Sequence, residues 1–410
     1  MTIIYQDGII LAMSITELQA LDALARAESK RFPIHRDMFM ALRKAQGRRF
    51  IGIVGPRGVG KTVILKQLAM ETDRSFYGSI DTFKDVVLFE FAKVLFEKQG
   101  IRTLLLDEIH FLPGFDGELK KIFDFLPDVH VVFTSSVALA LQQSAFDLSR
   151  RVRLIQVLPF SFREYVRFKE GVGLTGLMLD DVGHGNWTPE HMRYGYLFDE
   201  YLKGGLYPFA LTEPDPLNVL RSILETVLQR DIPNVAKVTY QDVTLIGKAL
   251  TFIGRSAVDG VNPTTIAKNL GITRYKAIEY VDLLSKAFIL IQVDPEGTNV
   301  LREPKILMQI PYRLLYRSWD DAIGAVREDF FATAMNMANM PFRYLKSTTG
   351  RKTPDFWLRT ESGDWVVEIG GPGKGRTQFK GVRVDRKMVL THDADSRRDA
   401  VPLFMAGYLA

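Results

Sequence analysis

The sequence predicts an α/β fold in which a mostly parallel β-sheet is flanked by helices and followed by further domains. Short apolar segments alternate with segments of helical periodicity through the first part of the chain, which is typical of parallel strands joined by helices. A glycine-rich loop separates the first strand from its helix. The chain has 410 residues, more than one hydrophobic core usually supports, so we expect two or three domains.

The predicted sheet domain occupies residues 1–159. Apolar residues at helical spacing between about 14 and 48 lead into the first strand. Each later strand is a short apolar run, and each expected helix carries a longer amphipathic pattern. The expected strands are 50–54, 75–80, 103–106 and 129–133, and the expected helices between them are 63–70 and 86–97.

Composition excludes several classes of function. Apolar residues make up 47% and charged residues 25%, as in an ordinary globular protein, and the net charge of +5 only hints at a polyanionic partner. The absence of cysteine excludes disulfides, thiol catalysis and zinc sites built on thiolates. No apolar run approaches the roughly 20 residues that cross a bilayer. We therefore expect no membrane partner and a cytoplasmic location.

The loop after the first strand carries a phosphate-binding motif. Residues 55–62 fit the pattern G-x-x-x-x-G-K-[ST] and lie between a strand and a helix, as this pattern requires. The glycines let backbone N–H groups converge on phosphates, Lys61 can neutralise the β- and γ-phosphates, and the Thr62 hydroxyl can ligate magnesium. The sequence therefore predicts ATP and Mg²⁺ as ligands of Gly55, Pro56, Arg57, Gly58, Val59, Gly60, Lys61, Thr62 and Val63.

Two acidic residues end the strand at 103–106. We expect Asp107 to position magnesium and Glu108 to act as the base that polarises the attacking water. Such acids could also be solvated residues at a strand end, but the phosphate-binding loop upstream favours the catalytic interpretation. Ser135 follows the next apolar strand, where its hydroxyl can lie between the metal and the γ-phosphate; Ser135 or Ser136 can equally cap a following helix.

Together these segments resemble a prokaryotic AAA-plus ATPase. The resemblance rests on Gly-Pro-Arg-Gly-Val-Gly-Lys-Thr, Leu-Leu-Asp-Glu-Ile, Phe-Thr-Ser-Ser and the leucine- and proline-containing stretch at 158–165 that ends in Arg-Glu-Tyr. It covers essentially the whole chain and is most specific in the N-terminal half. It implies a P-loop ATPase core at 1–159, a helical lid at 160–235, a winged helix-turn-helix at 236–300 and a restriction-endonuclease-like α/β domain at 301–410.

The resemblance also implies an assembly. In this family an arginine after the serine-bearing strand reaches the γ-phosphate bound by a neighbouring subunit, a role that suits the permanently charged guanidinium. Arg151 matches this position best, and Arg150, which stands where a glycine is common, is the alternative. A homo-oligomeric ring is implied, with a hexamer favoured. The family's Gly-Gly-x-Pro lid element has one extra residue here, at 204–208.

A helix-turn-helix pattern follows the predicted lid. Asn262 opens a short helix, Gly271 makes a turn, and a second helix begins at Thr273, with the apolar run 288–293 and the turn 294–297 as a wing. We expect Ala277, Ile278, Val281 and Leu284 to face inward. The predicted DNA-binding residues are Arg274, Tyr275 and Lys276 on the second helix and Lys374, Arg376 and Lys380 in a C-terminal basic run. A winged helix can also serve as a spacer between proteins.

The last domain resembles nucleases of the PD-(D/E)xK type. Asp355 and Glu368 are the carboxylates that could hold Mg²⁺ near a scissile phosphate, and Glu328 could be a third ligand. The lysine expected two residues after the glutamate is replaced by Gly370. DNA binding without cleavage is therefore the favoured interpretation.

These features predict an ATP hydrolase that binds double-stranded or branched DNA and couples ATP turnover to translocation or remodelling. Two alternatives stay open at this point. One is an ATP-regulated, Mg²⁺-dependent DNA nuclease. The other is a signalling switch in which bound nucleotide controls a protein partner.

Overall fold

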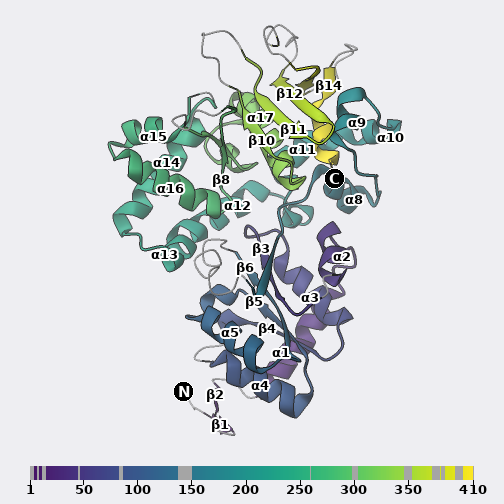
Figure 1. Cartoon of the computed structure of the whole chain (residues 1–410), viewed down its shortest axis with the longest axis vertical. Coiled ribbons are helices and arrows are strands. Elements are labelled where there is room, and N and C mark those ends of the chain that lie inside the picture. Colours follow the sequence, from purple (N-terminus) through teal and green to yellow (C-terminus); the bar gives the residue numbers. More distant parts are fainter. Residues whose placement is uncertain are drawn as a thin grey trace. The chain divides into compact units, whose positions relative to one another are not determined.

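The computed structural model describes residues 4–6, 9–11, 15–44, 47–82, 86–136, 150–258, 260–297, 303–345, 353–371, 379, 384–392 and 400–409. The chain divides into two compact units, residues 1–158 and residues 159–410. Figure 1 shows a β-sheet with surrounding helices in each of them.

The first unit is built on a five-stranded parallel sheet, which confirms the predicted α/β class. Its strand order is β4-β5-β6-β3-β7, and all neighbouring pairs are parallel. Because β3 lies between β6 and β7, the chain must cross over β3, and ligands bind beside such a crossover at the carboxyl ends of the strands. The strands are β3 (Phe50–Val54), β4 (Ser75–Ser79), β5 (Thr103–Asp107), β6 (His130–Ser135) and β7 (Val152–Gln156).

Helices cover both faces of this sheet. Alternate strand side chains, including Phe50, Leu104 and Phe133, pack in one core with apolar residues of α4 and α5. On the other face α3 contacts β4, β5 and β6, and α1 packs against α3 and β4 (Figure 1). Pro33 separates α1 from α2, since proline cannot continue a helix. The helices are α1 (Ile15–Ser29), α2 (Asp37–Lys44), α3 (Lys61–Glu71), α4 (Leu88–Gln99) and α5 (Phe115–Phe125).

A short antiparallel pair, β1 (Ile4–Gln6) and β2 (Ile9–Leu11), precedes α1. The sequence did not predict it, because three residues are too few to show a reliable alternation of apolar and polar side chains.

The second unit begins with short helices. They are α8 (Phe162–Glu170), α9 (Leu179–His184), α10 (Pro189–Arg193), α11 (Phe198–Glu200), α12 (Pro216–Thr226) and α13 (Ile232–Val235), with π-helical turns at Tyr201–Gly205 and Val227–Asp231. Three helices and an antiparallel strand pair follow: α14 (Tyr240–Arg255), α15 (Pro263–Leu270), α16 (Arg274–Lys286), β8 (Leu290–Val293) and β9 (Lys305–Met308).

A mixed five-stranded sheet completes the second unit. Its order is β10-β11-β12-β13-β14, antiparallel from β10 to β12 and parallel from β12 to β14. Helix α17 (Trp319–Met337) contacts β12. The strands are β10 (Phe342–Tyr344), β11 (Phe356–Thr360), β12 (Gly363–Gly370), β13 (Arg386–Thr391) and β14 (Ala400–Pro402).

Aromatic side chains join the beginning and the end of this second unit. The Phe162 ring centroid lies 5.3 Å from that of Tyr201 and 5.3 Å from that of Tyr408, while Phe198 and Phe330 are 4.8 Å apart. Burying rings of this size contributes heavily to a core. Residues at 160–235 therefore share a core with residues at 301–410, and the domain boundaries expected within this unit stay predictions.

The second unit also contains a buried ion pair. Arg313 and Asp329 are 1% and 0% exposed, with 2.5 Å between Arg313 Nε and Asp329 Oδ2. Arg313 also donates to the carbonyl of Ile253, and Asp329 accepts from the amide of Met308. The pair is satisfied by these additional hydrogen bonds, as a buried pair must be.

Candidate nucleotide-binding site

The loop between β3 and α3 follows a path that requires glycine. Gly58 and Gly60 adopt φ angles of 84° and 88°, in the left-handed region that side chains disfavour. A Cβ atom at Gly55 would lie 1.9 Å from the carbonyl oxygen of Val157. The loop leads directly into the N-terminus of α3, where backbone N–H groups favour an anion. This geometry fits a phosphate group.

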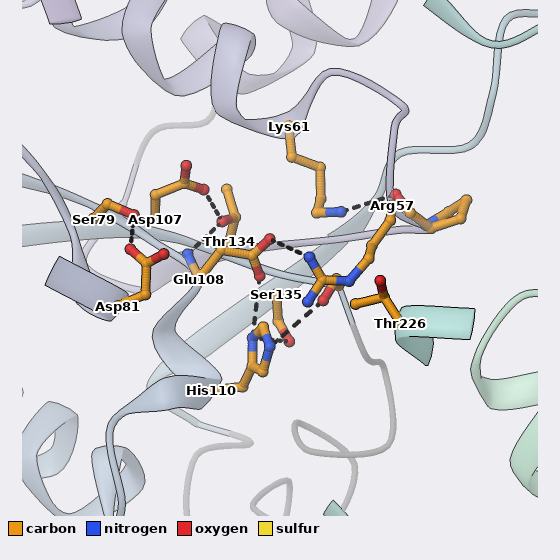
Figure 2. A network of polar contacts seen from close by, with 12 residues as sticks. Arg57, Lys61, Ser79, Asp81, Asp107, Glu108, His110, Thr134, Ser135 and Thr226 are labelled. Carbon is orange, nitrogen blue, oxygen red and sulfur yellow. Dashed lines mark hydrogen bonds and ion pairs between the residues drawn. The ribbon is translucent and has the colours of Figure 1, made fainter. Parts of the chain in front are cut away.

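Lys61, the first residue of α3, folds back across the loop. Its side chain is buried, and Nζ donates to the carbonyl oxygens of Gly55 at 2.8 Å and Pro56 at 2.9 Å (Figure 2). A bound phosphate would offer this ammonium a charged acceptor, which makes a stronger hydrogen bond than a carbonyl. Thr62, the next residue, is half-buried in the same first turn.

Arg36 supports the loop through hydrogen bonds to backbone carbonyl groups, a role that the sequence did not predict. It is buried, and its Nη1 donates to the carbonyl oxygens of Val59 at 3.1 Å and Leu158 at 2.7 Å. No motif marks this residue, because its partners are distant in sequence or belong to the backbone.

Asp107 ends β5 at the same edge of the sheet and is 3% exposed. Its Oδ1 accepts a hydrogen bond from the Thr134 hydroxyl, and its Oδ2 accepts one from the Tyr77 hydroxyl at 3.2 Å. Burial, together with the negative charge of Asp107, raises the pKa of Tyr77 well above its usual range, so this phenol remains a donor. Both hydrogen bonds hold the carboxylate in place at the end of β5.

Glu108 makes the turn that follows β5. Its φ of 52° is left-handed, a conformation that costs a non-glycine residue about 1–3 kcal/mol. Its backbone amide donates to the Thr134 hydroxyl at 2.9 Å. The carboxylate lies between two side chains, with Oε1 3.8 Å from Arg57 Nη1 and Oε2 3.3 Å from His110 Nδ1 (Figure 2). The contact with Arg57 brings the acidic pair and the phosphate loop into one site.

His110 and Ser135 lie beside Glu108. His110 Nδ1 is 3.4 Å from Ser135 Oγ, and its Nε2 is 3.5 Å from Ser136 Oγ. Ser135 is the last residue of β6 and pairs in register with Val54, at the start of the phosphate loop. The alternative role predicted for these serines was to cap a helix that follows β6. That helix would lie in residues 137–149, which are outside the described residues. His110 and Thr134 were missed, although polar residues at strand ends beside an acidic pair are a usable signal.

Arg151 lies at the opposite edge of the sheet. Arg151 directly precedes β7, and the first residue of β7 pairs with Phe50, the first residue of β3. The phosphate loop follows the other end of β3, so five residues, about 16 Å of strand, separate Arg151 from the loop. Its guanidinium binds Asp124, with Nη2 3.0 Å from Oδ2, and this hydrogen bond lowers the pKa of Asp124. Within one chain the structure does not bring Arg151 to the phosphate loop. Arg150 is exposed.

The predicted DNA-reading helix forms, but two of its charges are paired. Arg274 Nε is 2.5 Å from Glu303 Oε1, and Lys276 Nζ is 3.0 Å from Asp242 Oδ1. Tyr275 is 77% exposed. Lys374, Arg376 and Lys380 lie outside the described residues.

The inward face of α16 differs at one position. Ala277, Val281 and Leu284 are buried as expected, whereas Ile278 is 39% exposed, so that prediction was wrong. Residue 278 is turned by about 100° from 277 on a helix and falls beside the buried stripe. Tyr280 occupies the core instead, where its hydroxyl donates to Asp242 at 2.6 Å.

Asp355 directly precedes β11, and Glu368 lies in β12, the strand that pairs with β11. The amide of Asp355 donates to the carbonyl oxygen of Val367 at 3.1 Å, and its Oδ2 accepts from the amide of Ile369 at 2.7 Å, so Asp355 lies beside residues 367–369. Glu328 instead forms an ion pair with Lys305, with 2.6 Å between Oε2 and Nζ. Within the described ranges, no three His, Cys, Asp or Glu residues converge on a possible metal position. The expected third ligand is therefore not in place.

Helices long and apolar enough to cross a membrane do not occur in the part of the chain that the structure describes.

Two family models match parts of the chain. Residues 47–166 match the AAA domain family, and residues 195–309 match a domain of unknown function, DUF8612. The uncharacterized protein MJ1637 of Methanocaldococcus jannaschii is 28% identical over 309 residues; the match covers 69% of this chain and 64% of the relative. The chain thus spans less than two thirds of that relative's length.

Two solved structures show a distant likeness. The RuvB Holliday junction branch migration motor of Thermotoga maritima is 17% identical with a TM-score of 0.26, covering 68% of this chain and 90% of the motor. PCH-2 of C. elegans is 15% identical with a TM-score of 0.25, covering 68% and 69%. Scores this low add nothing to the assignment. The parallel sheet, the glycine-rich loop and the family match together identify an AAA-type P-loop nucleotide-binding domain at residues 47–166.

Proposed function

We propose that the chain is an ATPase that binds ATP with Mg²⁺ at the loop of residues 55–62 and hydrolyses it with Glu108 as the general base. The observation that carries this proposal is the contact of Arg57 with Glu108, 3.8 Å between Nη1 and Oε1. It joins the phosphate loop to the acidic pair, so one bound triphosphate can meet both. The AAA domain match supports the same reading.

The residues present fit a magnesium nucleotide. Mg²⁺ prefers oxygen ligands, and Thr62 with Asp107 would supply a hydroxyl and a carboxylate that Tyr77 and Thr134 hold in place by hydrogen bonds. When bound, the metal neutralises charge on the phosphate oxygens. Lys61 and the loop amides would hold the β- and γ-phosphates.

Glu108 would accept the proton of the attacking water. The Glu108 side chain is 18% exposed, and its left-handed backbone turns it out of the line of β5. Proton transfer to a positioned base as the water attacks is the step that makes ADP and phosphate. Phosphoryl transfer needs little more from the protein than positioning and charge.

The proposal includes a homo-oligomer, with a hexameric ring favoured. Arg151 lies about 16 Å of strand away from its own loop, so any contact of this arginine with a γ-phosphate must involve a second chain. Its present partner, Asp124, is partly exposed and holds the guanidinium at the surface.

DNA is the partner that we propose for ATP turnover, with translocation or remodelling as the work done. The support is the helix pair α15 and α16 followed by the β8–β9 pair, in the order that a winged helix requires. The ion pairs of Arg274 and Lys276 would have to exchange for phosphate contacts on binding. A DNA contribution from these two residues should therefore be small and strongly dependent on salt.

The test is the steady-state ATPase rate of the full chain without DNA and with single-stranded, duplex or branched DNA, with particle mass measured in parallel. We expect Mg²⁺-dependent hydrolysis that DNA accelerates, and a particle larger than one chain. An ATPase rate that none of these DNAs changes would contradict the coupling of hydrolysis to DNA and favour the signalling switch. No hydrolysis at all, in any of these mixtures, would remove the proposal itself.

The nuclease alternative has weaker support. It depends on Asp355 and Glu368, which neighbouring segments of one sheet supply, whereas Glu328 forms an ion pair with Lys305 and glycine stands at position 370. Incubation of plasmid DNA with Mg²⁺ and the intact chain should give no nicking. Nicking that Asp355→Ala abolishes would instead establish the nuclease.

A further inference from the structure

His110 lies next to the predicted base but belongs to none of the motifs that define the site. It is the middle residue of the turn Ile109–Phe111 that follows Glu108, and its side chain is 1% exposed. Burying a polar imidazole is costly unless both ring nitrogens find partners. Its surroundings therefore indicate what it does.

The imidazole bridges the base and the end of β6. Nδ1 is 3.3 Å from Glu108 Oε2 and 3.4 Å from Ser135 Oγ (Figure 2). Nε2 is 3.5 Å from Ser136 Oγ. His110 Nδ1 forms a hydrogen bond with Ser135 Oγ and lies within ion-pair distance of Glu108 Oε2. A carboxylate only accepts hydrogen bonds, so a proton on Nδ1 would let the ring donate to the base, with Nε2 beside Ser136.

Glu108 is consequently held from two sides. Arg57 approaches Oε1 from the phosphate loop, and His110 approaches Oε2 from the turn. The 3.8 Å to Arg57 is an ion-pair distance beyond hydrogen-bond range, the 3.3 Å to His110 is slightly longer than an ordinary hydrogen bond, and catalytic contacts commonly tighten when substrate binds. Of the two, His110 is the more deeply buried: 1% of its side chain is exposed against 21% for Arg57.

We propose that His110 is a positioning residue that orients the Glu108 carboxylate for the attacking water. It also links this carboxylate to Ser135 and Ser136, at the end of β6 beside the phosphate loop. This inference rests on the proposed ATPase function. Because the imidazole touches the base and not the phosphate loop, its loss should lower the rate of hydrolysis while ATP still binds. Residues that orient metal-ligating side chains contribute about 10–100-fold to activity, and we expect a loss of the same order from a residue that orients the base.

The test uses three substitutions of His110 in the full chain. His110→Ala removes both contacts, and we expect kcat to fall about 10–100-fold with KM and the Kd for a fluorescent ATP analogue changed less than about threefold. His110→Asn places an amide N–H near the position of Nδ1 and should recover most of kcat. His110→Gln places its amide near Nε2 instead and should remain slow.

His130 provides the matched control. It is a half-buried histidine in the same unit, at the opposite end of β6, so His130→Asn should leave kcat near the wild-type value. Melting temperature and analogue binding show whether each variant is folded. If His110→Ala does not fold, the contrast between His110→Asn and His110→Gln decides the question.

Several outcomes would overturn the inference. They are full kcat in His110→Ala, equal rates in the asparagine and glutamine variants, or a loss of binding that parallels the loss of rate. The double variant with Glu108→Gln should be no slower than Glu108→Gln alone, since both changes affect one step. If Glu108→Gln itself hydrolyses normally, the proposed function fails; if only His110→Ala does, the inference fails alone.

Discussion

Replacing Glu108 by glutamine tests the assignment of the base. The amide keeps the shape of the side chain but cannot accept the proton of water. A positioned base contributes about 10²–10⁴-fold to rate, which is about 2.7–5.4 kcal/mol at 1.36 kcal/mol per tenfold. The change also weakens the contacts with Arg57 and His110, 3.8 and 3.3 Å away. The pair with Arg57 is partly exposed and contributes about 0–1 kcal/mol, and the glutamine side chain can still form a hydrogen bond with the buried His110, so the variant should remain folded.

The assay combines phosphate release at saturating ATP with equilibrium binding of a fluorescent ATP analogue. We expect kcat to fall by about 10²–10⁴-fold and the Kd of the analogue to change less than about threefold, because the phosphate loop is untouched. Glu97→Gln, on the exposed face of α4, is the control and should keep the wild-type rate. Hydrolysis within threefold of wild type would refute the assignment, as would a parallel loss of binding.

Three further predictions concern the assembly and the second unit. Lys61→Ala and Arg151→Ala proteins should each be inactive. Mixing them should restore part of the ATPase rate, because some interfaces then combine an intact loop with an intact arginine. No recovery would argue against a site shared between two chains. Asp329→Ala leaves the buried guanidinium of Arg313 unpaired and should lower the free energy of unfolding by about 3–5 kcal/mol in urea titrations, whereas a loss below 1 kcal/mol would contradict the buried pair. Hydrogen bonds from Tyr280 and from Thr239 lower the pKa of Asp242 in the folded protein. The ionised carboxylate therefore stabilises the fold at any pH above its unfolded pKa of about 3.9, and this stabilisation is lost as pH falls through the lower pKa of the folded state. Asp242→Asn should therefore flatten the acid-side decline in the urea midpoint; an unchanged decline would show that other groups cause it.

The local parts of the nucleotide site were predictable from the sequence. The spacing of Gly55, Gly60 and Lys61 between a strand and a helix leaves few alternatives, and the left-handed angles at Gly58 and Gly60 follow the expected need for glycine. Alternating strands and helices likewise predicted the parallel sheet, because strands buried on both faces are short and almost wholly apolar.

The contacts around the acidic pair were not predictable in the same way. Thr134 and Tyr77 reach Asp107 because β4, β5 and β6 are neighbours, and the order of strands is not readable from one sequence. The ion pairs of Arg274 and Lys276 arise from Glu303 and Asp242, which lie far away along the chain. Sequence spacing on α16 showed where the two cations would be, but it could not show their partners.

The most direct test of the account is a crystal structure of the chain with Mg²⁺ and a non-hydrolysable ATP analogue. We expect the β- and γ-phosphates on the backbone of residues 55–62 beside Lys61, with Thr62 and Asp107 at the metal and Glu108 facing the γ-phosphate. An analogue bound elsewhere, or the loop without phosphate at saturating analogue, would contradict the account at its foundation.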